Sequence, residues 1–308
     1  MERLVIALGG NALQFGKERS YAEQLSRANS AFKNMAPVIS ARETVITHGN
    51  GPQVGDILLQ NEAAKKEVPQ MPLDACGSMS QGLIAQILTT ASYNSLSGIN
   101  RPAVQIFTRT IVSASDPAFA DPSKFIGPTY RKEEADELLR VRGWKMKEQN
   151  GKGWRRVVAS PEPVDILEWK TVVDLLENNY LPICTGGGGT PMVIEGGQLK
   201  GVEAVIDKDL ASSLLANKIG AQEFVILTDV ENVYVDYMQE SQRSISTTTV
   251  REMEEYFKQG KFQAGSMGPK VKAALNFLRK GGKEVVITSL EKAKQGVIGG
   301  TGTHIFRN

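Results

Sequence analysis

Short apolar runs alternate with segments of helical periodicity along this chain, and this alternation limits the folds that it can adopt. The apolar runs lie at residues 4–8, 43–47, 103–107, 110–112, 181–185, 202–206, 224–227 and 284–287. Segments with helical spacing of apolar residues lie between them, at 20–42, 53–67, 72–98, 164–179, 210–219 and 250–257. A hairpin turn is predicted at Gly196 and Gly197, and residues 231–247 are expected to form a loop. Compact apolar runs separated by helices are typical of parallel strands covered by helices on both faces. The sequence therefore predicts an α/β fold with a mostly parallel central sheet.

Three of the predicted strands end in turns that are rich in glycine. Gly9, Gly10 and Asn11 follow the first strand, Gly49, Asn50 and Gly51 follow the second, and four glycines at 186–189 follow a later one. Glycine lets the backbone approach a ligand closely and present its N–H groups to an anion. Because ligands bind at the carboxyl ends of strands in such sheets, we expect the first two turns to approach one small anion. The alternative is tight turns without a ligand, and His48 beside the second turn is expected to be structural.

The glycine run at 186–189 predicts a different kind of contact. Four consecutive glycines cost conformational entropy that a simple connection does not require. Backbone contact with nucleotide phosphates would offset this cost, so Gly187 and Gly188 are predicted to bind nucleotide.

Asp207, Lys208 and Asp209 stand between a predicted strand, 202–206, and a predicted helix that begins at Leu210. A lysine at such a junction suits a phosphate, and flanking carboxylates can hold its ammonium group in place. The alternative is a surface ion pair that caps the helix, with Asp209 as the N-cap.

Lys270 is predicted to lie in the first turn of another helix, directly after the glycine-containing loop 265–268. Asp74 and Gln81, on the helix at 72–98, are interpreted as solvent-facing or capping residues.

Residues from about 115 to 163 differ from their surroundings. The segment begins with a stretch rich in proline and small residues, continues with a charged helix at 131–142, and then predicts a hairpin that turns at Asn150 and Gly151. It is too polar for a core and too patterned for disorder, which favours a small lid inserted into the main domain. Lys124, Arg155 and Arg156 are its candidate cationic residues.

The overall composition excludes several classes of partner. Thirty-six Lys and Arg residues against 34 Asp and Glu give a net charge of +2, which predicts neither a nucleic-acid surface nor a membrane surface. The first apolar run is broken by Gly9 and Gly10, and no later run approaches the ~20 apolar residues of a membrane span. We therefore expect a cytoplasmic protein.

Cys76 and Cys184 lie in apolar segments and are expected to be buried free thiols, with a single disulfide as the alternative.

Taken together, four motifs resemble the carbamate kinases of the amino-acid kinase superfamily. They are LGGNAL at 8–13, THGNGPQVG at 47–55, VIDKDLA at 205–211 and GSMGPK at 265–270. DPAF at 116–119 and GWRRVV at 153–158 extend the resemblance through the predicted lid. It implies a three-layer αβα sandwich within one domain, 1–308. In this arrangement 1–200 would form the lobe for carbamate, with the lid inserted, and 201–308 the nucleotide lobe.

The resemblance also implies a reaction and roles for individual residues. The reaction is reversible phosphoryl transfer between ATP and carbamate, giving ADP and carbamoyl phosphate, with Mg²⁺, in a cytoplasmic homodimer of arginine metabolism. By motif, Gly9, Gly10, Asn11, Gly49, Asn50 and Gly51 would surround the carbamate. The catalytic residues would be Lys124, Lys208, Lys270 and Asp209, and no protein ligand for a metal is assigned. The nucleotide would contact Gly187, Gly188, Asp207, Asp229, Tyr234, Met267 and Gly268.

Carbamate chemistry is consistent with this set of residue types. Carbamate is already deprotonated and nucleophilic, so no general base is needed, and Asp209 is better interpreted as a residue that orients lysines. Two rival hypotheses remain open: a related kinase that acts on another small acid or a phosphate monoester, and a nucleotide-binding regulatory protein without turnover.

Overall fold

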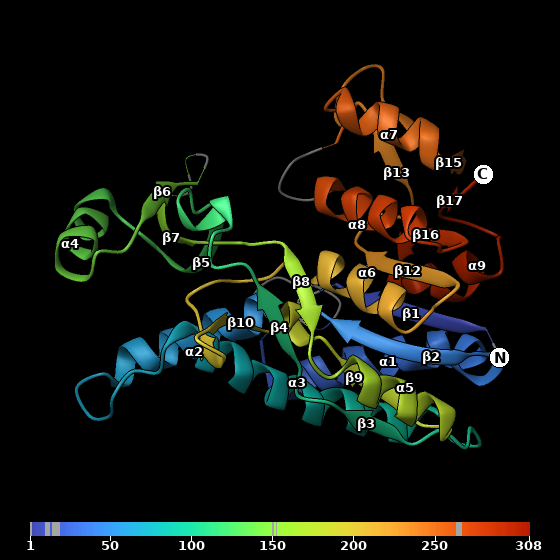
Figure 1. Cartoon of the computed structure of the whole chain (residues 1–308), viewed down its shortest axis with the longest axis horizontal. Coiled ribbons are helices and arrows are strands. Elements are labelled where there is room, and N and C mark those ends of the chain that lie inside the picture. The colour runs from blue at the N-terminus through green and yellow to red at the C-terminus, as the bar shows by residue number, and fades with distance from the viewer. Residues whose placement is uncertain (1, 10–12, 14–18, 150, 152, 263–266) are drawn as a thin grey trace.

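An eight-stranded sheet crosses the body of the protein in the computed structural model, which describes residues 2–9, 13, 19–149, 151, 153–262 and 267–308 (Figure 1). The strand order is β15-β17-β16-β12-β1-β2-β9-β3. Neighbouring strands are parallel from β16 to β3, whereas β17 runs antiparallel to β16 and β15 runs parallel to β17. The strand bounds, in the sheet order, are Thr247–Thr249, Thr303–Phe306, Glu284–Ser289, Glu223–Thr228, Arg3–Leu8, Glu43–His48, Leu181–Cys184 and Ala103–Gln105. The mostly parallel sheet predicted from the sequence is confirmed.

Helices cover both faces of this sheet because each central strand is apolar on both sides. Along β1, Leu4, Ile6 and Leu8 pack with α1 (Tyr21–Ala41) and α3 (Leu73–Ser95). The alternate residues Val5 and Ala7 belong to the core on the opposite face. There they join the helices α5 (Trp169–Glu177), α6 (Lys208–Lys218), α7 (Val250–Lys258) and α8 (Met267–Arg279). The short helix α9 (Ala293–Val297) packs on the α1 face, which completes three layers.

A second sheet lies beside the first and carries the connection to the lid. Its order is β11-β10-β4-β8, with bounds Gln198–Gly201, Thr190–Glu195, Arg109–Val112 and Pro163–Ile166. β10 and β11 form the hairpin predicted at Gly196 and Gly197, both of which have positive φ. The chain leaves this sheet after β4 and returns to it at β8.

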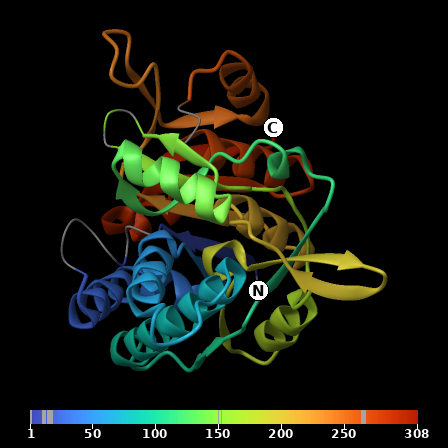
Figure 2. The same ribbon diagram turned by 90° about the vertical axis from the view of Figure 1, so that its left-hand side faces the viewer.

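Between these two strands the inserted segment forms a small unit that stands away from the main sheet (Figures 1 and 2). It contains a three-stranded antiparallel sheet, β5-β7-β6, and the helix α4 (Lys132–Arg142). The strand bounds are Lys124–Tyr130 for β5, Trp154–Val158 for β7 and Met146–Glu148 for β6. Ile126 and Val158 pack with Val54 and Ile57 of α2 (Gly51–Ala64). We call residues 115–163 the lid from here on.

Two local predictions were wrong. Residues 202–206 form no strand; their one ladder contact is an isolated bridge between Ala204 and Ala159. This run is apolar because it crosses between two small cores, with Val205 packed in one and Ile206 in the other. The helix predicted at 164–179 begins only at Trp169, because its first residues form β8, paired with β4.

One further expectation about local structure was wrong, whereas the expectation for the cysteines was correct. Residues 231–247, expected to be a loop, contain the antiparallel pair β13 (Val233–Val235) and β14 (Arg243–Ile245). Cys76 and Cys184 are buried free thiols, as expected. Within the part of the chain that the structure describes, none of the helices has the length and apolar character that crossing a membrane requires.

Candidate active site

The N-terminus of α6 is organised by Asp207. This residue is the N-cap of the helix, and its Oδ1 accepts hydrogen bonds from the backbone N–H groups of Asp209 and Leu210 at 2.9 and 3.4 Å. The alternative in which Asp209 caps the helix is therefore wrong by two residues, and Lys208 is the first residue of the helix. Capping by Asp207 releases the Asp209 side chain for other contacts.

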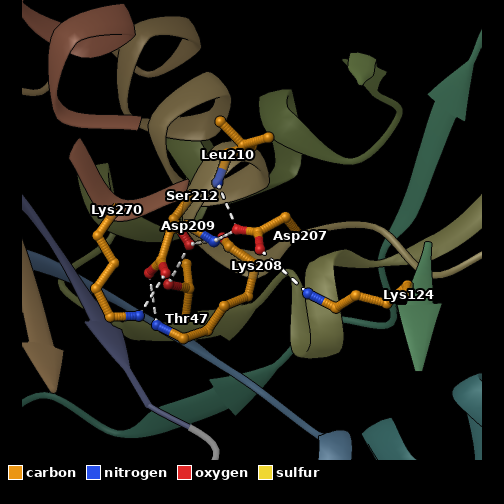
Figure 3. Close-up of polar contacts among 8 residues, drawn as sticks. All are labelled: Thr47, Lys124, Asp207, Lys208, Asp209, Leu210, Ser212 and Lys270. Atoms are coloured by element: carbon orange, nitrogen blue, oxygen red, sulfur yellow. Dashed lines mark hydrogen bonds and ion pairs between the residues drawn. The ribbon is translucent and has the colours of Figure 1, made fainter. Parts of the chain in front are cut away.

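Asp209 joins two lysines that come from different helices (Figure 3). Its Oδ1 lies 2.6 Å from Lys208 Nζ, and its Oδ2 lies 3.0 Å from Lys270 Nζ. The Asp209 side chain is only 3% exposed, and the two lysine side chains are 12% and 15% exposed. Lys270 lies in the first turn of α8, as predicted. The structure thus brings together three of the four residues that were expected to be catalytic.

The two lysines of this cluster share one carboxylate as their direct partner. Burial lowers the pKa of Lys208 below its usual value, although Asp209 opposes the shift. Burial acts on Lys270 in the same way, but there the charge of Asp209 prevails and raises the pKa. Burial alone would raise the pKa of Asp209; the two lysines reverse this and hold it at about 2. The charges of Asp207 and Asp229 also favour the protonated form of Lys270, and that of Asp207 favours the protonated form of Lys208. Two buried ammonium groups are thus held side by side, where they can donate to a bound phosphoryl group.

Ser212 and Thr47 link the first turn of α6 to the end of β2. Ser212 Oγ donates to the Lys208 carbonyl oxygen at 2.6 Å, and it lies 2.6 Å from Thr47 Oγ1 (Figure 3). Thr47 is buried near the end of β2, directly before the second glycine turn. This contact fixes α6 relative to that turn. The sequence analysis missed both residues, because a single Ser and a single Thr in apolar surroundings carry no distinguishing signal.

The two glycine turns are tied to each other and to α3. The Gly49 N–H donates to the Leu8 carbonyl oxygen at 3.0 Å, which joins the ends of β2 and β1. Asn50 is the N-cap of α2 but makes no side-chain capping bond; its amide instead donates to Ser80 Oγ of α3 at 2.7 Å. The first N–H groups of α2 are thus left without a side-chain cap, next to the glycine turn, as an anion site requires.

Gln81 of α3 is buried and forms hydrogen bonds to other elements, so its interpretation as a solvent-facing or capping residue was wrong. Its side chain is 2% exposed. Its Nε2 donates to the Thr108 carbonyl oxygen and to Thr190 Oγ1, both at 3.1 Å, and its Oε1 accepts from the Thr108 N–H at 3.0 Å. It therefore joins α3 to the start of β10, beside the glycine run at 186–189.

His48 is completely buried and neutral. Burial lowers its pKa to about 4, partly opposed by a hydrogen bond to Gly49 and reinforced by the charge of Lys208. Its Nδ1 lies 3.0 Å from the Gly49 carbonyl oxygen, which assigns the proton to Nδ1. With the proton on Nδ1, the basic nitrogen is Nε2, which is buried and has no hydrogen-bond partner among the described residues. The ring supports the glycine turn, and its pKa of about 4 makes it a weak proton acceptor near neutral pH.

Lys124 reaches the same region from the lid. It begins β5, and its Nζ lies 3.4 Å from Asp207 Oδ2 (Figure 3). Its side chain is 41% exposed, so it is the most accessible of the predicted catalytic lysines. The ion pair joins the lid to the N-cap of α6.

The predicted residues surround a cavity of about 350 Å³ at the carboxyl ends of β1, β2 and β12. We call it the transfer cavity. The predicted residues that line it are Gly9, Gly49, Asn50, Gly51, Lys124, Gly187, Asp207, Lys208, Asp209, Asp229 and Lys270. Gly10 and Asn11 lie outside the described residues. Pro269 and Thr228 also line the cavity and were not predicted.

A second cavity of about 310 Å³ adjoins the first, and Thr228 and Asp229 line both. Tyr234, Tyr237, Phe262 and Met267 give it an apolar, aromatic wall. Two predicted nucleotide residues lie elsewhere. Gly188 (φ +89°) packs under Ile206, whose carbonyl oxygen would lie 2.7 Å from an added Cβ, and Gly268 is buried in the first turn of α8.

The described residues offer no protein cage for a metal ion. Among them, no group of three or more His, Cys, Asp or Glu side chains is placed to hold one. Asp209 uses both oxygens on lysines, and Asp207 caps α6 and contacts Lys124. Mg²⁺ commonly binds through phosphate oxygens and water, so these residues are compatible with an ion that enters bound to a nucleotide.

A lysine-lined cavity at the carboxyl ends of a mostly parallel sheet defines a phosphotransferase site, and comparison with known proteins gives the family. Residues 2–289 match the sequence model of the Amino acid kinase family, and the chain belongs to that family. Within it, the chain groups with the carbamate kinases. It is 46% identical to the carbamate kinase of Thermococcus kodakarensis over 314 residues and 45% identical to that of Pyrococcus furiosus over 311, with at least 99% of each chain covered.

A solved structure gives the same result. The carbamate kinase from Giardia lamblia bound to AMP-PNP is 42% identical and superposes with a TM-score of 0.93, covering 100% of this chain and 99% of that one. The predicted family and fold class are confirmed.

Proposed function

We propose that this chain catalyses reversible phosphoryl transfer between ATP and carbamate, giving ADP and carbamoyl phosphate. One observation carries the proposal. Asp209 holds Lys208 and Lys270 on its two oxygens, beside the Gly49 turn, in a chain that is 46% identical to a carbamate kinase over its whole length. These ammonium groups converge where a phosphoryl group must be stabilised.

Charge neutralisation is the main task of such a site. Carbamate and the phosphoryl group are both anionic, and like charges about 4 Å apart repel by about 4 kcal/mol at an effective dielectric constant of 20. Lys208, Lys270 and the uncapped N-terminus of α2 supply positive potential at this point. We propose in-line transfer, with the lysines stabilising charge on the equatorial oxygens of the transferred group. Lys124 would add a third ammonium group from the lid.

We assign Asp209 an orienting role rather than a general-base role. Its pKa of about 2 makes it a poor proton acceptor, and both of its oxygens contact lysines. His48 is neutral but its Nδ1 proton faces the Gly49 carbonyl oxygen. Carbamate needs no deprotonation, so neither residue has to act as a base.

The nucleotide is proposed to extend from the transfer cavity into the aromatic second cavity. Tyr234 and Met267 would contact the base, and Asp229 lies where the two cavities meet. Gly187, in the glycine run, would approach the phosphates. When bound, Mg²⁺ would offset phosphate charge, held by the nucleotide phosphates and water rather than by a protein cage. Residues 201–308 would accordingly form the nucleotide lobe, and residues 1–200, with the lid, the carbamate lobe.

Three broader expectations accompany the proposal: a homodimer, a cytoplasmic location and a place in arginine metabolism. All three come from the family resemblance. Light scattering after size-exclusion chromatography would test the first directly, with a mass of twice 33.5 kDa expected.

The proposal is tested by ATP formation from ADP and carbamoyl phosphate, with acetyl phosphate as the control phosphoryl donor. We expect ATP from carbamoyl phosphate and much less from acetyl phosphate. Equal use of both donors would favour a broader acyl-phosphate enzyme. Nucleotide binding without ATP formation would favour a regulatory protein and would contradict the proposal.

A further inference from the structure

A cavity of about 510 Å³ lies between the first two turns of α2 and the lid strands β5 and β7. It adjoins the transfer cavity, because Gly51 and Pro52 line both. The α2 wall includes Asp56 and Leu59, and the cationic residues of the lining are Arg19 and Arg155. We call this cavity the arginine port. It is separate from the aromatic cavity, which adjoins the transfer cavity at Thr228 and Asp229.

The lid holds Arg155 in a fixed position at this port. Arg155 lies on β7 opposite Thr129 of β5, where the register shifts around Gly127 (φ +66°). The shift turns the Gly127 carbonyl oxygen toward the guanidinium, and Arg155 Nε donates to it at 3.2 Å. Arg155 Nη1 donates to Gln149 Oε1 at 3.1 Å. Both partners are neutral, so they orient the guanidinium without cancelling its charge.

Arg155 differs in this respect from the other arginines around it. Arg142 pairs with Glu62 and Arg156 with Glu203, at 2.9 and 2.6 Å, and Arg19 pairs with Asp56 at 2.8 Å. Among the residues that the structure describes, no carboxylate forms an ion pair with Arg155. Burial lowers its pKa, and no acidic neighbour opposes the shift. A partly desolvated guanidinium without a counter-charge is stabilised when an anion binds.

We propose that the arginine port is an oxyanion site in which Arg155 holds the small substrate, by the carboxylate of carbamate or the phosphate of carbamoyl phosphate, on its way to the transfer cavity. The inference rests on the proposed function. The port is distinct from the transfer cavity, because Arg155 lines only the port, whereas Lys124 and Lys208 line only the transfer cavity. A site at the entrance raises the local concentration of an anionic substrate and the rate at which it is captured.

The test compares Arg155→Gln with three other variants in the ATP-forming assay. Arg155→Lys keeps the charge. Gln149→Leu removes one orienting contact but leaves the guanidinium and its contact with the Gly127 carbonyl oxygen in place, so its effect should be smaller than that of Arg155→Gln. Arg131→Gln removes a lid arginine that is 82% exposed and pairs with Glu134 in the adjacent turn. All four are measured at low and high salt, with thermal unfolding as the check that each variant folds.

For Arg155→Gln we expect kcat/KM for carbamoyl phosphate to fall by about tenfold or more, with less dependence on salt and an unchanged KM for ADP. Arg155→Lys should retain most of the activity, Gln149→Leu should lose less than Arg155→Gln, and Arg131→Gln should behave like the parent protein. An equal rise in both KM values, an equal loss in Gln149→Leu, or no loss in Arg155→Gln would each overturn the proposal.

A second readout separates the port from the proposed reaction. Calorimetric titration with inorganic phosphate, in the absence of nucleotide, should show binding to the parent protein that is weakened about tenfold or more in Arg155→Gln. If the parent protein makes no ATP but Arg155→Gln still binds inorganic phosphate more weakly, the proposed function is wrong and the proposed oxyanion site is supported. If ATP is made, but inorganic phosphate binds the parent protein and Arg155→Gln equally and kcat/KM for carbamoyl phosphate is unchanged, the port proposal is wrong and the proposed function stands.

Discussion

Lys270 and Asp209 are 61 positions apart in the chain, yet the lysine Nζ lies 3.0 Å from Oδ2 of the carboxylate. The other oxygen of the same carboxylate contacts Lys208 at 2.6 Å. Two helices, α6 and α8, thus meet through one buried acid. The arrangement holds two ammonium groups beside one carboxylate, and each can donate further hydrogen bonds to a phosphoryl group. The predictions about catalysis follow from this geometry.

Replacing Lys208 by Met should reduce turnover while the fold survives. The change removes a buried charge that stabilises the transferred phosphoryl group, and it leaves Asp209 paired with Lys270. We expect kcat to fall by about 10²–10³-fold. Lys218→Met, at the other end of α6, removes a lysine that pairs with Asp165 and should leave kcat unchanged. A Lys208→Met enzyme with full turnover would show that the cluster is structural.

Lys124→Ala should lower turnover with little change in nucleotide affinity. Lys124 contacts Asp207 from the lid and lines the transfer cavity, but it does not line the aromatic cavity. Turnover and the Kd for ADP, measured separately, distinguish these effects. The matched control is Lys132→Ala, which removes an exposed lid lysine that pairs with Asp136. Undiminished turnover in Lys124→Ala would remove the lid from the mechanism.

The sequence predicted those parts of the site that short-range patterns encode. The strands before Gly9 and Gly49, the position of Lys270 in a first helical turn and the hairpin at Gly196 were all correct, because strand and turn residues are adjacent in the chain. The resemblance to known motifs predicted that the lysines surround one anion. No pattern in the sequence, however, indicated that Lys124 would contact Asp207, which lies 83 positions away.

The errors have a common physical cause. The run at 202–206 is apolar because two separate cores bury it, and apolarity alone does not distinguish a strand from a buried crossing. Gln81 and Ser212 act through partners more than 25 and 150 positions away, respectively. Likewise, the arginine port depends on which carboxylates fail to reach Arg155, a property of the tertiary structure that the sequence does not express.

Gly188→Ala should destabilise the protein more than Gly197→Ala. Both glycines have positive φ, +89° and +79°, so alanine adds backbone strain of about 1–2 kcal/mol at either position. At Gly188 the added Cβ would also lie 2.7 Å from the Ile206 carbonyl oxygen, whereas at Gly197 no atom lies within 4 Å. The crowding should add about 1–3 kcal/mol. Denaturant unfolding of the two variants checks the difference, and equal losses would contradict the tight packing of the glycine run.

His48 should make the protein less stable in mild acid. Its pKa is about 4 in the folded protein against an ordinary value of 6.5, so between these values the unfolded chain binds a proton that the folded protein does not. The free energy of unfolding should therefore fall by about 3 kcal/mol as the pH drops from 6.5 to 4. The slope should be reduced in His48→Gln, measured by denaturant unfolding at several pH values.

His304 provides the control for that experiment. A hydrogen bond to Glu284 raises its pKa above 6.5, so its contribution is complete at low pH and is lost as the pH rises through the raised value. His304→Gln should therefore keep the loss of stability between pH 6.5 and 4. A slope unchanged in His48→Gln would mean that groups other than His48 cause it.

Tyr234→Leu should weaken nucleotide binding and leave the KM for carbamoyl phosphate unchanged. Tyr234 and Tyr237 lie with ring centroids 5.9 Å apart on the wall of the aromatic cavity, next to Met267. Stacking of a base on an aromatic side chain contributes about 1–3 kcal/mol, so the Kd for ADP should rise by roughly fivefold to a hundredfold. Fluorescence or calorimetric titration with ADP measures the change.

This variant is the complement of Arg155→Gln. Tyr234 lines the aromatic cavity, which meets the transfer cavity at Thr228 and Asp229. Arg155 lines the arginine port, which meets the transfer cavity at Gly51 and Pro52. If the two substrates enter from opposite ends, Tyr234→Leu should change the KM for ADP alone and Arg155→Gln that for carbamoyl phosphate alone. Tyr93→Leu, a change at an 88% exposed tyrosine on α3, should change neither. A Tyr234→Leu enzyme with an unchanged Kd for ADP would place the base outside the aromatic cavity.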